Sequence, residues 1–161
     1  MRIILRNACL LSVFFSLIPC MLFAAAGDLD TSFGGTGIVT TDFESDSFDQ
    51  AYGVGIQPNG KILVVGDSES FTGTRIGIAR YNTSGALDLS FSTDGKHAEV
   101  FFDNETYGQS VVAQNDGKIL VAGSYDSGDS VIGFDFVLAR YTSSGVLDET
   151  FNEVGRQTVD F

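Results

Sequence analysis

Apolar residues follow two different patterns along this chain of 161 residues. Residues 1–26 form one nearly continuous apolar stretch, whereas the remainder consists of short apolar runs separated by Gly, Asn, Asp and Ser. Short runs rich in Ile, Leu, Val, Phe and Tyr and bounded by such residues are typical of β-strands. Beyond residue 26 no stretch shows the apolar period of an amphipathic helix, so we expect this part to be all-β.

The apolar runs belong to a repeat whose matching segments recur at a nearly constant spacing. Three motifs recur in the same order, and this self-similarity is the signature of a repeat architecture. The motifs are LDTSFGGTG at 29–37, with LDLSFSTDG at 87–95 and LDETFNEVG at 147–155; NGKILVVG at 59–66, with DGKILVAG at 116–123; and IARYNTSGALD at 78–88, with LARYTSSGVLD at 138–148.

Each full unit contains four strand patterns. Asn59-Gly60 and Asp116-Gly117 precede the most apolar runs, and such dipeptides supply the positive φ angles at both central positions of a type I′ hairpin turn. The predicted strands form two sets of four, one at residues 51–57, 61–65, 75–81 and 97–102 and the other at residues 109–114, 118–122, 134–141 and 157–161. The fourth strand of each set follows an "LDxSF" segment. The runs after the turns are apolar on both faces, which indicates sheets stacked between neighbours.

Four antiparallel strands followed by a linker to the next four are the plan of a β-propeller blade. We therefore expect an all-β, β-propeller-like array of four-stranded antiparallel blades, with two full repeats and flanking strands. The domain covers residues 27–161, with units at 29–86 and 87–146 and a partial third unit at 147–161. Residues 37–43 are expected to form a flanking strand without a blade of their own. A β-helix or a β-sandwich is the alternative.

The repeated motifs "LDxSF", "DGKILVAG" and "ARYxxSGxLD" closely resemble the delta-60 repeat, which occurs in tandem in secreted bacterial proteins. The resemblance covers nearly all of residues 29–161. It implies a β-propeller-like fold, an exported location and a scaffold, and it implies no reaction. Members of that family typically carry many repeats, whereas this sequence has two full units, and a propeller needs about four or more blades to close.

Residues 1–26 have the three parts of a secretory signal peptide. Arg2 and Arg6 give a positive start, an apolar middle follows, and three alanines ending at Ala26 close the segment. We therefore expect cleavage after Ala26. The alternatives are a retained membrane anchor, whose apolar run Pro19 would interrupt, and lipidation at Cys20.

Cleavage would leave an acidic chain without cysteine. The sequence has 9 basic and 21 acidic side chains and a formal net charge of -12, and both cysteines, Cys9 and Cys20, lie in the signal segment. The secreted chain would hold no disulfide and no thiolate metal site. We expect no nucleic-acid partner and no membrane-surface partner, because binding to either relies on Lys and Arg. No membrane span is expected after cleavage.

Residues that recur in every unit are expected to be structural. Arg80 and Arg140 recur in "ARY", while Asp30, Asp88 and Asp148 recur in "LD". Arginine binds a carboxylate through two parallel hydrogen bonds, so the pattern fits either a ligand site in each blade or an ion pair within it. We expect an ion pair between the third strand and the segment after its turn, because such pairs are common in structural roles.

His97 is the only histidine, and Gln157 and Val39 take its place in the other units. A Ser-His-Asp triad or a histidine metal site would have to use this residue, yet the sequence marks out no partners for it. We expect His97 to be a strand residue on a partly solvated face.

Two acidic clusters are further candidates for a site. They comprise Asp42, Glu44, Asp46 and Asp49 in the first unit and Asp126, Asp129 and Asp135 in the second. Carboxylate-rich loops can bind calcium, but the first cluster lacks the glycine and the bidentate glutamate of an EF-hand loop, and neither cluster recurs faithfully in the other unit, so we expect solvated loops.

Several glycines suggest a phosphate-binding loop at first sight. They are Gly34, Gly35, Gly37, Gly53 and Gly55. No Lys-Ser/Thr pair and no helix pattern follows them, so we expect these glycines in turns.

The sequence therefore predicts no catalytic, cofactor-binding or metal-binding residues. The leading hypothesis is an exported, non-enzymatic repeat scaffold that is secreted, periplasmic or at the cell surface and binds a protein or a glycan. One alternative is an enzyme or enzyme-accessory module, similar to a glycoside hydrolase, that uses an acidic loop such as residues 43–50. Another is a fragment of a longer repeat protein. Two blades leave apolar outer faces, so we expect self-association or binding to another repeat protein.

Overall fold

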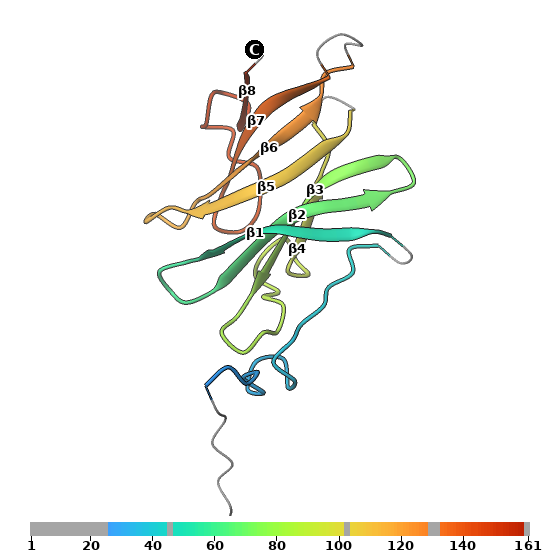
Figure 1. The fold of residues 1–161 in the computed structure, drawn as a ribbon. Helices are drawn as coiled ribbons and strands as arrows, with labels where there is room; N and C mark the ends of the chain where they lie inside the picture. The colour runs from blue at the N-terminus through green and yellow to red at the C-terminus, as the bar shows by residue number, and fades with distance from the viewer. Residues whose placement is uncertain (1–25, 45–46, 102–103, 129–132, 160–161) are drawn as a thin grey trace, which may run out of the picture.

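The computed structural model describes residues 26–44, 47–101, 104–128 and 133–159, which form eight strands in two antiparallel sheets (Figure 1). The first sheet contains, in spatial order, β1 (Asp49–Ile56), β2 (Ile62–Ser70), β3 (Gly73–Tyr81) and β4 (Lys96–Glu99). The second contains β5 (Thr106–Ala113), β6 (Ile119–Asp126), β7 (Phe134–Tyr141) and β8 (Arg156–Val159). The prediction of two four-stranded blades is confirmed, and we call the sheets blade 1 and blade 2.

Each blade has a front face and a back face, because side chains alternate along a strand. We define the front face of blade 1 as the face that carries Leu63 and Val65, and its back face as the one that carries Ile62 and Val64. In blade 2 the corresponding positions place Leu120 and Ala122 on the front face and Ile119 and Val121 on the back face.

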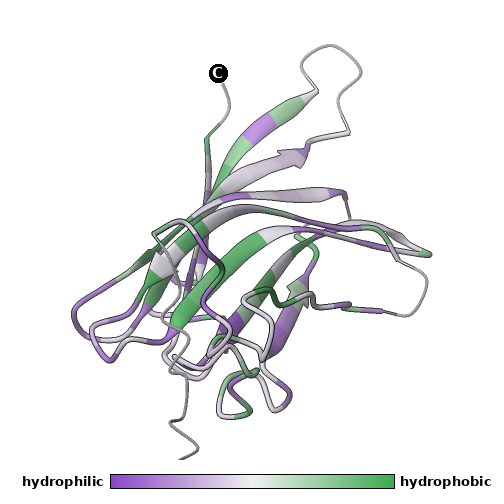
Figure 2. Cartoon of the chain, turned by 60° about the horizontal axis from the view of Figure 1, so that its bottom comes forward, coloured by the Kyte–Doolittle hydropathy of each residue, from purple (hydrophilic) through white to green (hydrophobic). Residues whose placement is uncertain are grey.

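The front face of blade 1 packs against the back face of blade 2, with β5 lying against β1, β2 and β3 (Figure 1). This layer is the core, and Figure 2 shows that the most hydrophobic stretches lie within the strands. The core residues are Leu63, Val65, Ile76, Ile78, Phe91 and Phe101 from blade 1 and Val111, Ile119, Val121, Val137, Ala139 and Tyr141 from blade 2. Burying one large apolar side chain contributes roughly 1.5–3 kcal/mol, so this layer is the main source of stability.

Gly53 and Gly55 lie inside β1 and not in turns, so the turn prediction is wrong for these two residues. A Cβ atom at Gly53 would lie 3.0 Å from the Gln109 carbonyl oxygen of β5. The missing side chain therefore allows the first strands of the two blades to approach closely. For Gly34, Gly35 and Gly37 the prediction is confirmed, since all three have positive φ angles in turns of the N-terminal region.

The β1–β2 and β5–β6 hairpins form where predicted, but they do not use type I′ turns. In the first hairpin the Gly60 amide donates to the Gln57 carbonyl, and the Gln57 amide donates to the Lys61 carbonyl, both at 2.8 Å. Pro58 and Asn59 are therefore the central residues, and Gly60 follows them with a φ of 82°. This three-residue loop is a common alternative to type I′ and requires a positive φ only at its last residue.

The second hairpin repeats this arrangement, with Gly117 at a φ of 85°. Its amide donates to the Gln114 carbonyl at 3.0 Å. The side chain of Asp116 accepts the Lys118 amide, as Asn59 accepts that of Lys61. Asn and Asp are thus selected as turn-forming acceptors and not as residues with positive φ.

Residues 37–43 form no strand, so the prediction of a flanking strand in this segment is wrong. Among the described residues, no strand pairs with this segment through a hydrogen-bond ladder. The segment instead crosses the back face of blade 1 (Figure 1). We call residues 29–43 the strap. The boundaries of the predicted sequence units also do not coincide with those of the sheets, because β4 lies in the second unit and pairs with β3 of the first.

Replacement of either turn glycine by alanine is expected to lower the free energy of unfolding by about 1 kcal/mol or more, since alanine is strained at positive φ. Gly60→Ala should cost more than Gly117→Ala. A new Cβ at Gly60 would lie 3.1 Å from the Thr83 methyl group, whereas the nearest atom at Gly117 is 3.5 Å away.

Urea unfolding of both variants measures these losses, with Gly117→Asn as the control. Asparagine tolerates positive φ, so this control should lose less stability than Gly117→Ala. Equal losses in the alanine and asparagine variants would contradict the explanation by backbone angle.

Candidate interaction surface

In each blade, a lysine, an arginine and a phenylalanine of the repeated motifs gather around the repeated aspartate. In blade 1, Asp88 Oδ2 lies 2.6 Å from Arg80 Nε and 2.7 Å from Lys61 Nζ. The guanidinium of Arg80 also stacks over the Phe91 ring, 4.8 Å from its centroid. The Lys of "GKIL", the Arg of "ARY" and the Asp and Phe of "LDxSF" therefore form one cluster, and the predicted ion pair is present.

Blade 2 contains the same cluster at Asp148. Its Oδ2 atom lies 2.7 Å from Arg140 Nε and 3.0 Å from Lys118 Nζ. Arg140 stacks over Phe151 at 4.9 Å. The third recurring aspartate, Asp30 in the strap, instead accepts the hydroxyl and amide of the serine two residues later.

These contacts favour the ionised aspartates. Burial raises the pKa of Asp88, but hydrogen bonds from Lys61 and Ser90 and the charge of Arg80 outweigh it and hold the pKa far below the usual range. The pKa of Asp148 is likewise lowered, chiefly by the hydroxyl of Thr150 and then by its lysine and arginine partners. Both carboxylates are thus fully charged at neutral pH and hold the "LDxSF" segment against the sheet.

The cluster of blade 1 also binds blade 2 directly. Arg80 Nη1 donates to the Ser143 carbonyl oxygen at 2.5 Å, and the Ser92 amide donates to the Ser144 carbonyl oxygen at 2.9 Å. Phe91 packs on Gly145, where an added Cβ would lie 2.7 Å from the phenyl ring. The "LDxSF" segment of one blade therefore recognises the "SG" turn of the next through two carbonyl groups and a glycine.

The strap makes the same contact with the "SG" turn of blade 1. The Gly34 amide donates to the Ser84 carbonyl oxygen at 2.8 Å. Phe33 packs on Gly85, whose absent Cβ would lie 3.2 Å from its ring. The strap carries its own copy of the motif, LDTSF at 29–33, and makes with it the contact that the "LDxSF" segment of a preceding blade would make.

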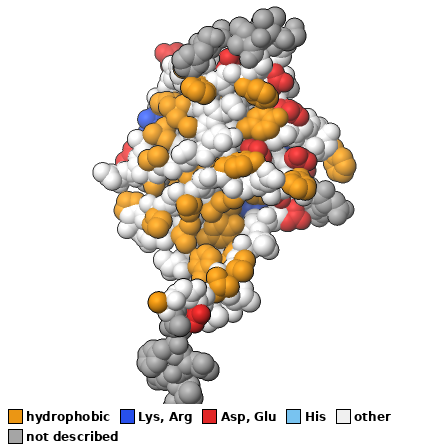
Figure 3. Space-filling model, in the orientation of Figure 1, with side chains coloured by type: hydrophobic (Ala, Val, Ile, Leu, Met, Phe, Trp, Pro, Cys, Tyr) orange, Lys and Arg blue, Asp and Glu red, His pale blue; other side chains and the backbone are white. Residues whose placement is uncertain are grey.

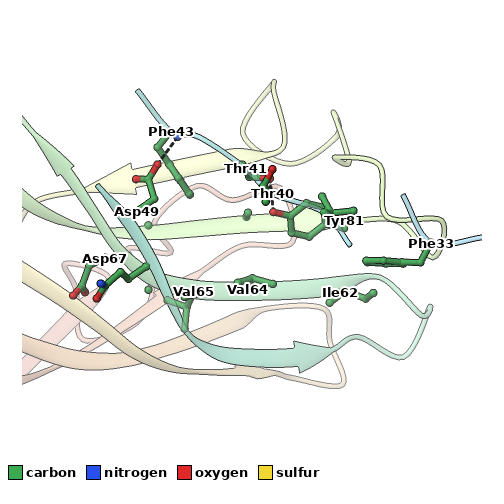
Figure 4. Close-up of a pocket in the computed structure, with 16 residues that line it drawn as sticks. Phe33, Thr40, Thr41, Phe43, Asp49, Ile62, Val64, Val65, Asp67 and Tyr81 are labelled. Carbon is green, nitrogen blue, oxygen red and sulfur yellow. Dashed lines mark hydrogen bonds between the residues drawn. The ribbon is translucent and has the colours of Figure 1, made fainter. Parts of the chain in front are cut away.

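Beyond this contact the strap covers only part of the back face of blade 1. Figure 4 shows Thr41 directed at the Tyr81 hydroxyl, at 2.5 Å, and the Phe43 amide bonded to Asp49 at 3.0 Å. Between strap and sheet remains a cavity of about 420 Å³. It is lined mainly by apolar side chains of the strap, β2 and β3, among them Ile62 and Val64.

The front face of blade 2 is uncovered within the described chain. Phe136 is 62% exposed, whereas Ile76, its counterpart in blade 1, is 0% exposed in the core. A shallow hollow of about 430 Å³ lies on this face. Its lining consists of Gln109, Ala122, Gly123, Phe136, Val137, Leu138, Gln157 and Val159.

Apolar side chains are also exposed elsewhere on the molecule. Figure 3 shows them gathered over the middle and lower part of one side, with acidic side chains mainly toward its right-hand edge. On blade 1, Val54 and Ile56 of β1 lie on the part of the back face that the strap leaves open, and they are 69% and 71% exposed. Uncovered apolar sheet faces of this kind normally mark interaction surfaces.

His97 has side-chain partners that the sequence did not reveal. Its Nε2 atom lies 3.1 Å from Glu99 Oε2, and its Nδ1 atom lies 3.3 Å from Ser92 Oγ. The ring meets Tyr141 of blade 2 edge-on, with 5.3 Å between the centroids. Burial, and after it the charge of Glu99, raises the pKa of Tyr141 well above its ordinary value. His97 therefore belongs to the contact between the blades, and the signal for it was its position on a strand next to the core.

The carboxylates of the first acidic cluster are bonded to their own surroundings. Glu44 forms an ion pair with Arg75 at 2.8 Å, and Asp49 accepts the Phe43 amide. Asp46 lies outside the described residues. These contacts indicate a role in holding the strap and the adjoining loop.

The second acidic cluster is dispersed. Asp126 accepts the Gly128 amide at 2.9 Å, Asp135 is buried in β7, and Asp129 lies outside the described residues. Among the residues described, no three Asp, Glu, His or Cys side chains are grouped so that they would share a metal ion.

Asp67 of β2 links the two blades, since its Oδ1 atom accepts the Gly108 amide of β5 at 3.0 Å. Burial raises the pKa of this carboxyl, and the bond from Gly108 offsets only part of that effect. Ionisation of Asp67 is therefore less favourable in the folded protein than in the unfolded chain, so the charged carboxylate opposes folding.

Two equivalent arginines allow the contact between blades to be measured. Arg80→Ala is expected to lower the free energy of unfolding by about 3 kcal/mol, because it leaves Asp88 short of a partner and the Ser143 carbonyl unpaired. Arg140→Ala removes the same ion pair but, among the described residues, no bond to another blade. Its loss should be smaller by about 1.5 kcal/mol or more, the value of a charged hydrogen bond. Chemical denaturation measures both, and equal losses would contradict the cross-blade role of Arg80.

Asp67→Asn is expected to stabilise the protein at neutral pH, because asparagine keeps the acceptor for Gly108 and carries no charge. Since the folded pKa of Asp67 is raised, the wild-type protein gains stability as the pH falls through that pKa. The advantage of the variant should therefore shrink toward about pH 4, the pKa of an unfolded aspartate. Unfolding curves at several pH values test this, and an asparagine variant that is less stable than wild type at neutral pH would refute it.

The predicted signal peptide lies almost entirely outside the described residues. Within the described part, no helix is long and apolar enough to cross a membrane. No curated protein matches the chain.

Residues 57–91 and 114–151 match the family model described as "Domain of unknown function (DUF5122) beta-propeller". Each segment begins at the first hairpin turn of a blade and ends at the phenylalanine of "LDxSF", so it spans the whole Lys-Arg-Asp-Phe cluster. The match is compatible with the resemblance to the delta-60 repeat. A segment of each blade, which includes its second and third strands, is thus similar to a β-propeller domain of unknown function.

Proposed function

We propose that this protein is an exported, non-enzymatic repeat scaffold that binds a protein partner through the front face of blade 2. The observation that carries the proposal is the contrast between equivalent faces. The front face of blade 1 is buried in the core, whereas that of blade 2 presents the same kinds of apolar side chains to solvent.

The chemistry of this face favours a protein over a glycan. Its exposed residues include Phe134, Phe136 and Val159, and polar side chains such as Gln109 and Gln157 lie beside them in the hollow. A sugar presents many hydroxyl groups that need hydrogen-bond partners, whereas an apolar protein surface buries such side chains without them.

The signal-like pattern of residues 1–26 supports export. The contacts of the carboxylates support a non-enzymatic role. Asp49 and Asp67 both line the cavity under the strap, as an acidic site for glycoside hydrolysis would require, but each accepts a backbone amide at 3.0 Å. Such bonds fit the structural roles of joining strap to sheet and blade to blade.

The test is crosslinking of the full chain in cells that secrete it. Phe136 is replaced by a photo-crosslinking phenylalanine analogue, and Phe71, which is fully exposed at the β2–β3 turn, is replaced in the same way as the control. We expect a defined protein adduct from position 136 and none from position 71. Mass spectrometry of the released protein should show Gly27 as its first residue.

Three results would refute the proposal. One is a chain that keeps Met1 and stays inside the cell. Another is the absence of any protein adduct from position 136. The third is the same adducts from positions 136 and 71.

A further inference from the structure

We propose that the front face of blade 2 binds the back face of blade 1 of a second copy of this chain, and that this binding displaces the strap of the second copy. The inference rests on the proposed function, since it names the partner of the same face. The contact between the two blades of one chain is the template for the contact between chains.

The side chains that would meet the second copy repeat those of the front face of blade 1. Leu63 has its counterpart in Leu120, Ile78 in Leu138, Arg80 in Arg140 and Phe91 in Phe151. Asn152 holds the backbone of its "LDxSF" segment at a φ of 49°, as Ser92 does at 47°. The amide that binds a neighbouring blade is therefore held in the same conformation in both segments.

The surface that would be bound is nearly identical to one that is already bound. Blade 2 contributes six back-face residues to the core, and five of them have the same residue type at the equivalent position of blade 1, whereas the sixth, Val137, corresponds to Gly77. The pairs are Val111 and Val54, Ile119 and Ile62, Val121 and Val64, Ala139 and Ala79, and Tyr141 and Tyr81. The front face of blade 2 would therefore meet in a second copy nearly the same surface that the front face of blade 1 meets within the chain. This is why we infer that its partner is a second copy.

The acceptors of the "SG" turn are also repeated in blade 1. Thr83 and Ser84 present the carbonyl groups that correspond to those of Ser143 and Ser144, and Gly85 corresponds to Gly145. Ser84 now accepts the Gly34 amide of the strap. Strap and incoming blade therefore compete for one acceptor.

The strap covers the back face less completely than a blade does. Val54 is 69% exposed beside the strap, whereas Val111 is 6% exposed beside blade 1. The strap also leaves the cavity of about 420 Å³, and its residues 38–43 form no strand. Exchange of the strap for a complete blade would bury more apolar surface, which is the driving force for the exchange.

One difference from the template weakens the contact between chains. Ser110 and Val112 of β5 stand where blade 1 has Gly53 and Gly55, so a docked blade cannot approach β5 as closely as β5 approaches β1. After signal cleavage, seven basic and 21 acidic side chains also make the copies repel each other. We therefore expect a reversible association that added salt strengthens by screening the repulsion.

A contact between the front of one copy and the back of another is head-to-tail. It leaves one front face and one back face free in every dimer, so it can continue into a ring or a filament. Assembly in steps of two blades would continue the same stacking that joins the blades within one chain.

Sedimentation velocity of the secreted chain at increasing concentration tests the proposal. We expect the wild-type chain to associate, and Phe151→Ala to weaken the association constant roughly tenfold or more, because a buried aromatic anchor is lost. Phe33→Ala should strengthen association, because it weakens the competing strap. Phe71→Ala is the matched control and should change nothing, since Phe71 is 103% exposed and lies at a hairpin turn. Circular dichroism confirms that each variant is folded.

A crosslink then locates the contact. With a photo-crosslinking phenylalanine analogue at position 151 and a mixture of isotopically labelled and unlabelled chains, we expect adducts between chains at residues 82–86. The same analogue at position 91 should give adducts within one chain at residues 142–146. Adducts from position 91 would show that the crosslinking reaction captures the known contact between blades 1 and 2.

The outcomes separate this inference from the proposed function. A monomer at every concentration, with and without the Phe33→Ala change, would overturn the inference, as would association that Phe151→Ala leaves intact or adducts at another surface. If position 136 nevertheless crosslinks to a different protein, the scaffold function stands and only the second copy is wrong. If it crosslinks to nothing, both proposals fail.

Discussion

In each blade a single aspartate carboxylate joins the lysine that directly precedes the second strand and an arginine of the third strand. Asp88 binds Lys61 and Arg80, and the distances to both are below 3 Å. Because one partner stands at the start of the second strand and the other lies in the third, the carboxylate attaches the "LDxSF" segment to the sheet at a defined place and angle. A charged group with two cationic partners and a hydroxyl is stable in this partly buried position, whereas the same carboxylate without them would not be. The rest of the structure depends on this attachment.

The attachment matters because it places an aromatic ring and a backbone amide at the end of the blade. Phe91 can pack on Gly145, and the Ser92 amide can reach the Ser144 carbonyl, only when the segment before them is held. The core between the sheets supplies most of the stabilising free energy, but it consists of apolar side chains that have little directionality. The polar contacts at the "SG" turn therefore define how one blade sits on the next.

Two surfaces of the chain present incomplete versions of this contact. The strap supplies Phe33 and the Gly34 amide to blade 1 without a sheet behind them, and blade 2 presents Arg140 and Phe151 with no described turn to receive them. A repeat array stabilises each unit through its neighbours, so an uncovered end is a place where free energy remains to be gained by binding. The proposed scaffold role and the proposed exchange of the strap both follow from that property.

The repeat by itself determined the fold class, the eight strands and the pairing of Arg80 with Asp88, because strand patterns, turn residues and charge pairs are local in sequence. Only the tertiary structure decided four other features. The hairpins use a three-residue loop, since the loop geometry depends on strand register and not on the Asn-Gly pair alone. Gly53 serves the approach of β5, and His97 meets Tyr141, since both contacts join residues from different blades. Residues 37–43 form no strand because a strand needs a neighbouring strand to accept and donate its hydrogen bonds, and among the described residues none pairs with this segment.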